Sequence, residues 1–376
     1  MENRSRAAVA EEQSRENKAQ IGEGSFLFLF SHKWNIKPNH GVVAKTNLLD
    51  GVTLHNFDDE LLYEFEACNQ AQKDTDAWYA CNIELNPGVY KLRLKLPSSS
   101  FLEQTVVLCR DWQTSVFCGS KEFADDVHTL VPDLPNAAIF LHRRNHLNLN
   151  DEQTRFTEEA RLSLCYQRQV SNAGFRDILE RFAESPMLTI YGIHLLLLNN
   201  YNNKNYPKTL IERLRTLLGY HPDVEALALK LGQESEIATF ESPTMLRQSW
   251  KYLVLETIRA RELITRYSVL SVIAEYLLAS NLWLTWGGTS HKFQASRSDN
   301  RSQTSLVANT LKVMLEHNQP YAQTGQIEAL EGISPMVDDI EPKQSEMNQE
   351  ALIRRFVREL LLPRSTGERL LEKSNQ

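Results

Sequence analysis

The first third of the chain alternates apolar and polar residues with period two. In the run from Tyr90 to Leu96, apolar and aromatic side chains occupy the even positions, and the odd positions hold Lys91, Arg93 and Lys95. Successive side chains of a strand point to opposite faces of a sheet. The run therefore predicts a half-buried strand with its apolar face inward and its basic face in solvent.

Turn-forming residues separate this run from similar ones. An Asn-Pro-Gly turn at 86–88 precedes it, and further strands are predicted at about 101–109 and 112–118. The continuous apolar run 26–30 predicts a central strand. Short strands at this spacing are typical of an antiparallel β-sandwich, which we predict for residues 21–120.

The segment from Pro87 to Phe117, PGVYKLRLKLPSSSFLEQTVVLCRDWQTSVF, resembles one family of small sandwiches. It is similar to the PG-x-Y-x-L-R … W pattern of prealbumin-like, carboxypeptidase-regulatory and PEGA-type domains. The resemblance covers 31 residues and implies a hairpin that packs on the opposite sheet. Because such sandwiches are general adhesion and scaffolding modules, the resemblance implies a fold and little about function.

From about Thr154 the apolar spacing changes to the 3.6-residue period of an amphipathic helix. The run 187–198 is apolar nearly all round, which predicts a helix at the centre of a bundle, and a last helix is expected at about 267–284. Short connections between the helices favour an antiparallel bundle over 161–286. The predicted fold class is α+β, an N-terminal antiparallel β-sandwich followed by an α-helical bundle domain.

Four further segments complete the predicted division of the chain. They are a disordered tail at 1–20, a connector at 121–160, a linker with a short helix at 287–347, and a C-terminal amphipathic helix and tail at 348–376. Within the linker, 287–302 and 319–347 are polar and lack periodicity. We expect these two stretches to be the most protease-sensitive, because they bury too little apolar surface to offset the entropy of ordering.

Two helical segments resemble modules that accompany caspase-like proteases in bacterial conflict and signalling operons. These are 186–198, PMLTIYGIHLLLL, and the segment from Leu214 to Asp223 that contains Leu-Gly-Tyr-His-Pro-Asp. In those systems a sandwich with a helical unit acts as a regulatory or adaptor part. The resemblance implies a role in bacterial antiviral defence with a caspase-like protease as partner. No protease domain is found in this chain, so no catalytic residue carries over.

The charge distribution argues against a nucleic-acid partner. The chain has a net charge of −7, and residues 21–135 hold 16 Asp and Glu against 9 Lys and Arg. Nucleic-acid affinity rests on clustered cations, whereas the basic residues elsewhere in this chain are interspersed with acidic ones. We therefore expect no direct contact with nucleic acid.

Membrane and secretory signals are not found. No apolar run reaches the roughly 18–20 residues of a membrane span, and the first 20 residues lack the apolar core of a secretory signal. The cysteines are odd in number and form no Cys-x-x-Cys pair: Cys68, Cys81, Cys109, Cys118 and Cys165. We expect a cytoplasmic protein with reduced, buried thiols rather than disulfides or zinc ligands.

The chain shows no motif for nucleotide binding or for a nucleophilic serine. The alternative function is an enzyme whose site is assembled from scattered residues, for example a hydrolase that pairs Cys165 with His194. Both residues lie in amphipathic or apolar stretches, so we expect them in the core. His142 and His146 have i,i+4 spacing without a third ligand nearby, and they are interpreted as part of a polar surface connector. We predict no catalytic residues, metal or cofactor.

Two pairs of residues are candidates for contacts with a protein partner. Arg143 and Arg144 are adjacent in the predicted connector and suit docking against an acidic surface. Trp283 and Trp286 lie one turn apart on the last predicted helix. They either fill the core or contact a partner, because tryptophan is enriched in both places.

The C-terminal helix is the sharpest candidate for an interaction. It carries Arg354, Arg355, Phe356 and Arg358, and its apolar stripe docks either on the bundle or in a partner's groove. The sequence thus predicts a non-enzymatic protein-interaction module. Its expected role is adaptor, regulator or substrate of a bacterial caspase-like defence protease.

Overall fold

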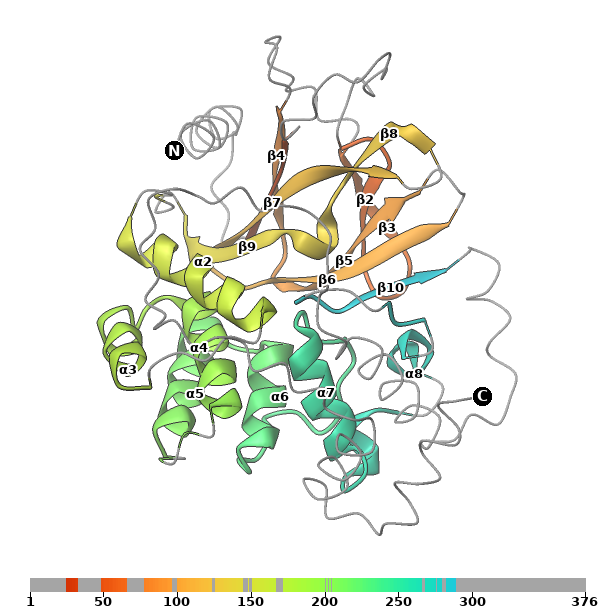
Figure 1. Ribbon diagram of the computed structural model, residues 1–376. Helices are drawn as coiled ribbons and strands as arrows, with labels where there is room; N and C mark the ends of the chain where they lie inside the picture. Colours follow the sequence, from red (N-terminus) through yellow and green to blue (C-terminus); the bar gives the residue numbers. More distant parts are fainter. Residues whose placement is uncertain are drawn as a thin grey trace, which may run out of the picture.

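The computed structural model is a mixed α+β fold in which two β-sheets pack beside a group of helices (Figure 1). The predicted tail 1–20, nearly all of the linker 287–347 and the C-terminal segment 348–376 lie outside the described residues. The structure describes residues 25–32, 49–65, 78–96, 100–123, 126–144, 148, 151–166, 172–199, 201, 203, 205–265, 268–274, 276–278 and 282–288.

In the first sheet, β1 (Ser25–His32) is an interior strand with a neighbour on each side. The other strands of this sheet are β4 (Trp78–Leu85), β7 (Trp112–Phe123), β8 (Asp126–Pro132) and β9 (Ala138–Arg143). β1 pairs antiparallel with β4 and parallel with β7, while β7 also pairs antiparallel with β8 and β9. The prediction of a purely antiparallel arrangement is therefore wrong for one pair. Parallel pairing needs a long crossover, which the strands of the second sheet supply.

The second sheet is antiparallel throughout its described pairs, in the order β10, β6, β5, β2, β3. Its strands are β2 (Val52–His55), β3 (Leu61–Glu64), β5 (Gly88–Lys95), β6 (Phe101–Leu108) and β10 (Thr285–Gly288). β5 and β6 form the hairpin that the alternating pattern and its turns predict. β10 comes from the far end of the helical half and adds an edge strand beside β6 (Figure 1).

β1 confirms the prediction of a central strand. Leu27 and Leu29 are buried in the main core on one face. On the other face, Phe28 and Phe30 pack around Phe117, with ring centroids 5.7 Å apart in both pairs. β1 and β7 both contact β6, so the inner faces of the two sheets share one core. A strand buried on both faces has no polar positions to alternate, which explains its continuous apolar sequence.

The predicted register of β5 is confirmed for its apolar face, on which Leu92 and Leu94 are fully buried. The prediction that the basic face lies in solvent is wrong. Lys95 is exposed, but Lys91 is only 4% exposed and Arg93 is half-buried. Lys91 pairs with Asp59 and Glu103 on this face, so part of the basic face is buried despite the alternating sequence.

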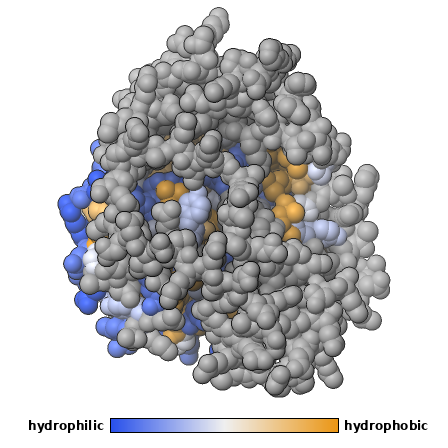
Figure 2. Space-filling model, viewed as in Figure 1, coloured by the Kyte–Doolittle hydropathy of each residue, from blue (hydrophilic) through white to orange (hydrophobic). Residues whose placement is uncertain are grey.

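The helices form the second half of the described chain. They are α2 (Glu152–Cys165), α3 (Asn172–Arg181), α4 (Pro186–Leu198), α5 (Asn205–Leu218), α6 (Pro222–Lys230), α7 (Arg247–Glu256) and α8 (Val269–Ile273). α4 is buried along most of its length and contacts α2, α3, α5 and α6 as well as β9, which confirms its predicted central place. The described surface over α2 and α3 is mainly hydrophilic (Figure 2). None of the described helices is long and apolar enough to cross a membrane.

The boundary between the strand-rich and helical parts of the chain does not lie where the sequence predicts. β8, the short 3₁₀ helix η2 (Leu134–Asn136) and β9 occupy much of the predicted connector 121–160. The helix expected at 267–284 is wrong beyond Ile273, since α8 ends there and the chain goes on to β10. The strand-rich half therefore extends past residue 120 and receives its last strand from beyond the helices.

The cysteines follow the prediction only in part. Cys109, Cys118 and Cys165 are free thiols, and burial raises the pKa of Cys109 to about 12. Cys81 is disulfide-bonded, which corrects the expectation that all the cysteines are reduced. Cys68 lies outside the described residues.

Candidate binding cavity

A cavity of about 500 Å³ opens where three turns of the chain meet. Pro87 and Gly88 come from the turn between β4 and β5, Arg110 and Asp111 from the turn between β6 and β7, and Gly219 begins the turn between α5 and α6. The remaining lining residues are Val89, Leu108, Cys109, Arg143, Thr216, Leu217, Leu218 and Tyr220. The cavity thus lies at the junction of the strands with the helical half.

Trp112 holds the parts of this cavity together. Its side chain is buried at the start of β7, and its indole N–H donates a hydrogen bond of 3.0 Å to the carbonyl of Leu217 at the end of α5. Arg143 is its cross-strand neighbour on β9, and the guanidinium carbon of Arg143 lies 4.4 Å from the centroid of the Trp112 ring. One side chain therefore fixes both a helix end and an arginine of the cavity wall.

The charged groups of the cavity, Arg110, Asp111 and Arg143, are exposed. A hydrogen bond of 3.1 Å from the backbone N–H of Trp112 to the carbonyl of Cys109 closes the tight turn that carries Arg110 and Asp111. Asp111 has φ 64°, in the left-handed region where aspartate is one of the tolerated residues. Within the described part of the chain, no ion pair involves Arg110, Asp111 or Arg143. The arrangement can therefore bind a ligand through two guanidinium groups and one carboxylate.

The structure brings only one of the predicted interaction residues, Arg143, to this cavity. The neighbouring Arg144 lies over Phe26 instead, with its guanidinium carbon 4.1 Å from the ring centroid. His142 belongs to β9 and is buried, with Nε2 2.8 Å from Ser115 Oγ, so its interpretation as part of a surface connector is wrong. His146 lies outside the described residues, as do the C-terminal candidates Arg354, Arg355, Phe356 and Arg358.

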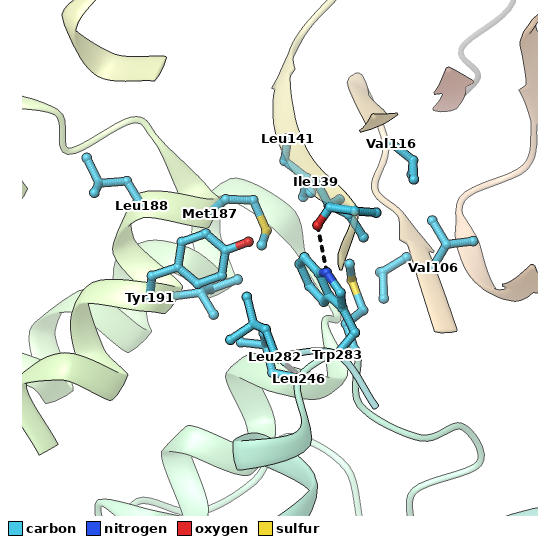
Figure 3. Packing of buried hydrophobic residues seen from close by; sticks show 14 of the residues in the cluster. Val106, Val116, Ile139, Leu141, Met187, Leu188, Tyr191, Leu246, Leu282 and Trp283 are labelled. Carbon is cyan, nitrogen blue, oxygen red and sulfur yellow. Dashed lines mark hydrogen bonds between the residues drawn. The ribbon is translucent and has the colours of Figure 1, made fainter. Parts of the chain in front are cut away.

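Trp283 and Trp286 are fully buried, and neither lies on a helix. Figure 3 shows Trp283 between side chains of α4 and strand residues, and its indole N–H donates a hydrogen bond of 2.8 Å to the carbonyl of Ala137. Trp286 lies on β10 and donates a hydrogen bond of 2.6 Å to Glu103 Oε2. Of the two predicted alternatives, core filling describes both residues, and neither offers an exposed surface to a partner.

Beside Trp286, the second sheet holds a buried group of charges that the sequence analysis missed. Glu103 is 1% exposed and lies 2.7 Å from Arg93 Nε and 3.5 Å from Lys91 Nζ. Asp59, on the turn before β3, accepts hydrogen bonds from Lys91 at 2.6 Å and from Arg93. Burial raises the pKa of Asp59, but these two cations outweigh it and lower the pKa overall. Asp59 is the exposed end of the group, and Glu103 at its buried end also accepts the Trp286 hydrogen bond that links the group to β10.

The alternative site, Cys165 with His194, is not formed. His194 is fully buried on α4, where Nε2 lies 2.9 Å from Ser249 Oγ and the ring stacks on Tyr252. Cys165 lies near Arg161 and Glu158, and burial raises the pKa of its thiol. A thiol with a raised pKa is a poor nucleophile, because the thiolate is the reactive form.

Ser249 connects His194 to a second buried group, Asp223. Asp223 accepts hydrogen bonds from the backbone N–H groups of Met245 and Leu246, at 2.8 and 2.9 Å, and from Ser249. Burial raises the pKa of Asp223 to about 6 and lowers that of His194 to about 3. These side chains have no exposed surface. Their chemistry is structural, because they join α4, α6 and the start of α7.

The described residues hold no cluster of three or more His, Cys, Asp or Glu side chains that suits a metal ion. A comparison with known protein families finds no family model that matches the chain, and a comparison with curated proteins finds no significant match. The two resemblances noted in the sequence stay predictions.

Proposed function

We propose that this chain is a non-enzymatic protein-interaction module. The observation that supports this best is the contrast between its two sets of polar groups. The groups suited to acid–base chemistry, His194 and Asp223, are sealed inside the helical half. The cavity instead presents Arg110 and Arg143, which stay charged at neutral pH and act through hydrogen bonds and charge rather than as nucleophile or base. Its one carboxylate, Asp111, has no histidine or lysine beside it among the described lining residues.

The finer architecture belongs to the same proposal. The two sheets constitute a prealbumin-like or PEGA-like β-sandwich, and the helices constitute a bundle that packs on it. The Pro-Gly turn of the resemblance lies at the cavity, because Pro87 and Gly88 line it. The binding surface is thus built by both parts.

The proposed partner is a caspase-like bacterial defence protease, for which the chain acts in the cytoplasm as adaptor, regulator or substrate. This rests on the resemblance of segments 186–198 and 214–223 to modules of such systems. The second of these segments includes Thr216 and Tyr220, which line the cavity. A partner that binds at the cavity would therefore contact the resembling segment directly.

The partner is tested with a protease whose gene lies beside that of this chain. The purified chain is mixed with the catalytically inactive protease, and light scattering after size exclusion measures the mass of the complex. We expect a complex that Arg143→Glu weakens and that Arg259→Glu, an exposed control on the helical half, leaves intact. Failure to form a complex at micromolar concentration, or a neighbourhood without a protease gene, would contradict the partner.

The substrate role is tested with the active protease and mass spectrometry. First cuts within 287–302 or 319–347 are expected, because their polar, aperiodic sequences predict segments that bury too little apolar surface to pack. First cuts inside 87–117 or 175–230 would contradict the substrate role. Peptidase or esterase activity of the chain alone that is lost in Cys165→Ala would overturn the non-enzymatic assignment.

A further inference from the structure

We infer that the cavity binds an acidic, extended peptide segment whose carboxylates pair with Arg110 and Arg143. The inference rests on the proposed function and names the chemistry of the segment that the partner presents. Three observations support it: the position of the two arginines, the net charge of the cavity and its apolar lining.

Arg143 is arranged in advance for a carboxylate. Its guanidinium lies 4.4 Å from the ring centroid of Trp112, whose indole is fixed by the Leu217 carbonyl. An arginine over an aromatic face keeps the N–H groups at its edge free, and these match the two oxygens of a carboxylate. Because the ring restricts the side chain before binding, less conformational entropy is lost when the ligand arrives.

Arg110 and Asp111 set the sign of the preferred ligand. Both lie on the tight turn closed by Trp112, and both line the cavity. Together with Arg143 they leave one excess positive charge, which favours an acidic segment over a basic one. The Asp111 carboxylate supplies an acceptor for a backbone N–H of the same segment.

The rest of the lining favours a peptide over a bare anion. Val89, Leu108 and Leu217 give the cavity apolar surface, and Tyr220 adds an aromatic ring at 40% exposure. A volume of about 500 Å³ lies in the range of sites for drug-sized ligands, which is the size of a few extended residues. A lone phosphate or carboxylate would leave the apolar lining uncovered. Nucleic acid is disfavoured, because two arginines on a chain of net charge −7 do not form a cationic track.

The test is fluorescence anisotropy with two labelled peptides, Gly-Asp-Leu-Asp-Gly and its uncharged counterpart Gly-Asn-Leu-Asn-Gly. The Asp peptide is expected to bind, and its affinity should fall as salt is added. The Asn peptide should bind at least about tenfold more weakly. Arg110→Ala and Arg143→Ala should each cost about tenfold or more in affinity for the Asp peptide. Arg143→Lys should also weaken it, because lysine keeps the charge but loses the paired N–H groups.

Two variants separate binding from folding. Thr216 is exposed on α5 at the cavity, so Thr216→Trp is expected to fill the cavity and block the peptide while thermal unfolding stays unchanged. Arg259→Ala removes an exposed arginine elsewhere and should leave affinity unchanged. Equal binding of the two peptides, unchanged affinity in Arg110→Ala and Arg143→Ala, or tighter binding of a single-stranded oligonucleotide would overturn the inference.

The same variants distinguish this inference from the proposed function. A protease complex that forms normally with Arg110→Ala and Arg143→Ala would overturn the acidic-segment inference and leave the interaction module standing. Binding of the Asp peptide without any protease complex would overturn the proposed partner and leave the inference standing.

Discussion

At the scale of single residues, Trp112 determines the cavity wall more than the arginines themselves. Its ring supports Arg143 and its N–H holds the Leu217 carbonyl at the last turn of α5. Helix ends leave carbonyls without partners inside the helix, and a buried indole is one way to satisfy them. Trp112 therefore connects the first sheet, the end of α5 and the proposed ligand site.

Trp112→Phe should lower both stability and peptide affinity. Phenylalanine fills most of the space but leaves the Leu217 carbonyl without its donor, so we expect a loss of about 1–3 kcal/mol in the free energy of unfolding. Urea denaturation measures it. Trp283→Phe is the matched control, because it removes an equivalent hydrogen bond to Ala137 within the core. It should cost similar stability and leave peptide affinity unchanged; an equal loss of affinity in both variants would contradict a local role for Trp112.

The buried histidines predict how stability depends on pH. Burial lowers the pKa of His194 and of His221 to about 3, from an ordinary value of 6.5. Between about pH 3 and 6.5 the unfolded chain therefore binds more protons at these sites, so stability rises as pH increases through this window. Asp223 acts in the opposite direction between about 3.8 and 6, because burial raises its pKa to about 6. Two histidines with larger shifts outweigh this one group.

Urea denaturation at several pH values between 4 and 7 checks this prediction. Stability should increase toward pH 7, and the increase should be smaller in His194→Gln, which keeps a hydrogen-bonding side chain near Ser249 but does not titrate. A variant whose stability changes with pH as steeply as that of the parent chain would show that His194 does not carry the effect.

At the scale of elements, β10 shows why some of the fold is invisible in the sequence. The helix expected at 267–284 rests on apolar spacing. The strand sequence Thr-Trp-Gly-Gly is too short to give a recognisable pattern of its own. What places β10 is tertiary: its backbone pairs with β6, and Trp286 finds an acceptor in Glu103. Propensity and pattern carry no information about a partner strand about 180 residues away, because tertiary contacts override local preference.

Elements that bury a face by local pattern alone were predicted well. The Leu92 and Leu94 face of β5 and the all-apolar α4 are in place. The burial of Lys91 is not predictable from alternation, because the pattern places every polar residue in solvent. It carries no information about Glu103 and Asp59, which lie on another strand and a distant turn. The cavity is not predictable for the same reason, because its turns are far apart in sequence; of its lining, the sequence points only to Arg143.

Glu103→Gln tests the buried charge group under β10. Two cations would remain on this face with only Asp59 as an acidic partner, and breaking a buried pair typically costs about 3–5 kcal/mol. Chemical denaturation should show a loss of this order. The double variant Lys91→Met with Glu103→Gln removes one of the uncompensated cations and should recover part of the loss. A single variant as stable as the parent chain would show that the group contributes nothing to the packing of β10.

At the scale of the whole molecule, two tryptophans join the strand-rich and helical halves. Trp112 donates from β7 to α5, whereas Trp283 donates from beyond the helices to Ala137 in the strand-rich half. The main core runs through both halves without interruption, since it includes side chains of β1, β6 and β9 together with those of α4 and α5. A sandwich and a bundle that folded independently would each need a core of its own.

The described fold should therefore unfold in one cooperative transition. Far-UV circular dichroism, which follows the helices, and tryptophan fluorescence, which follows the junction, should give coincident thermal curves. Trp283→Phe should shift both curves together, because it removes a contact between the halves rather than within one. A fragment of residues 21–120 should fail to fold alone, since it lacks β9, β10 and the helices that complete its core, whereas residues 25–288 should retain the cooperative transition. Two separated transitions, or a folded 21–120 fragment, would restore the two-domain division that the sequence predicts.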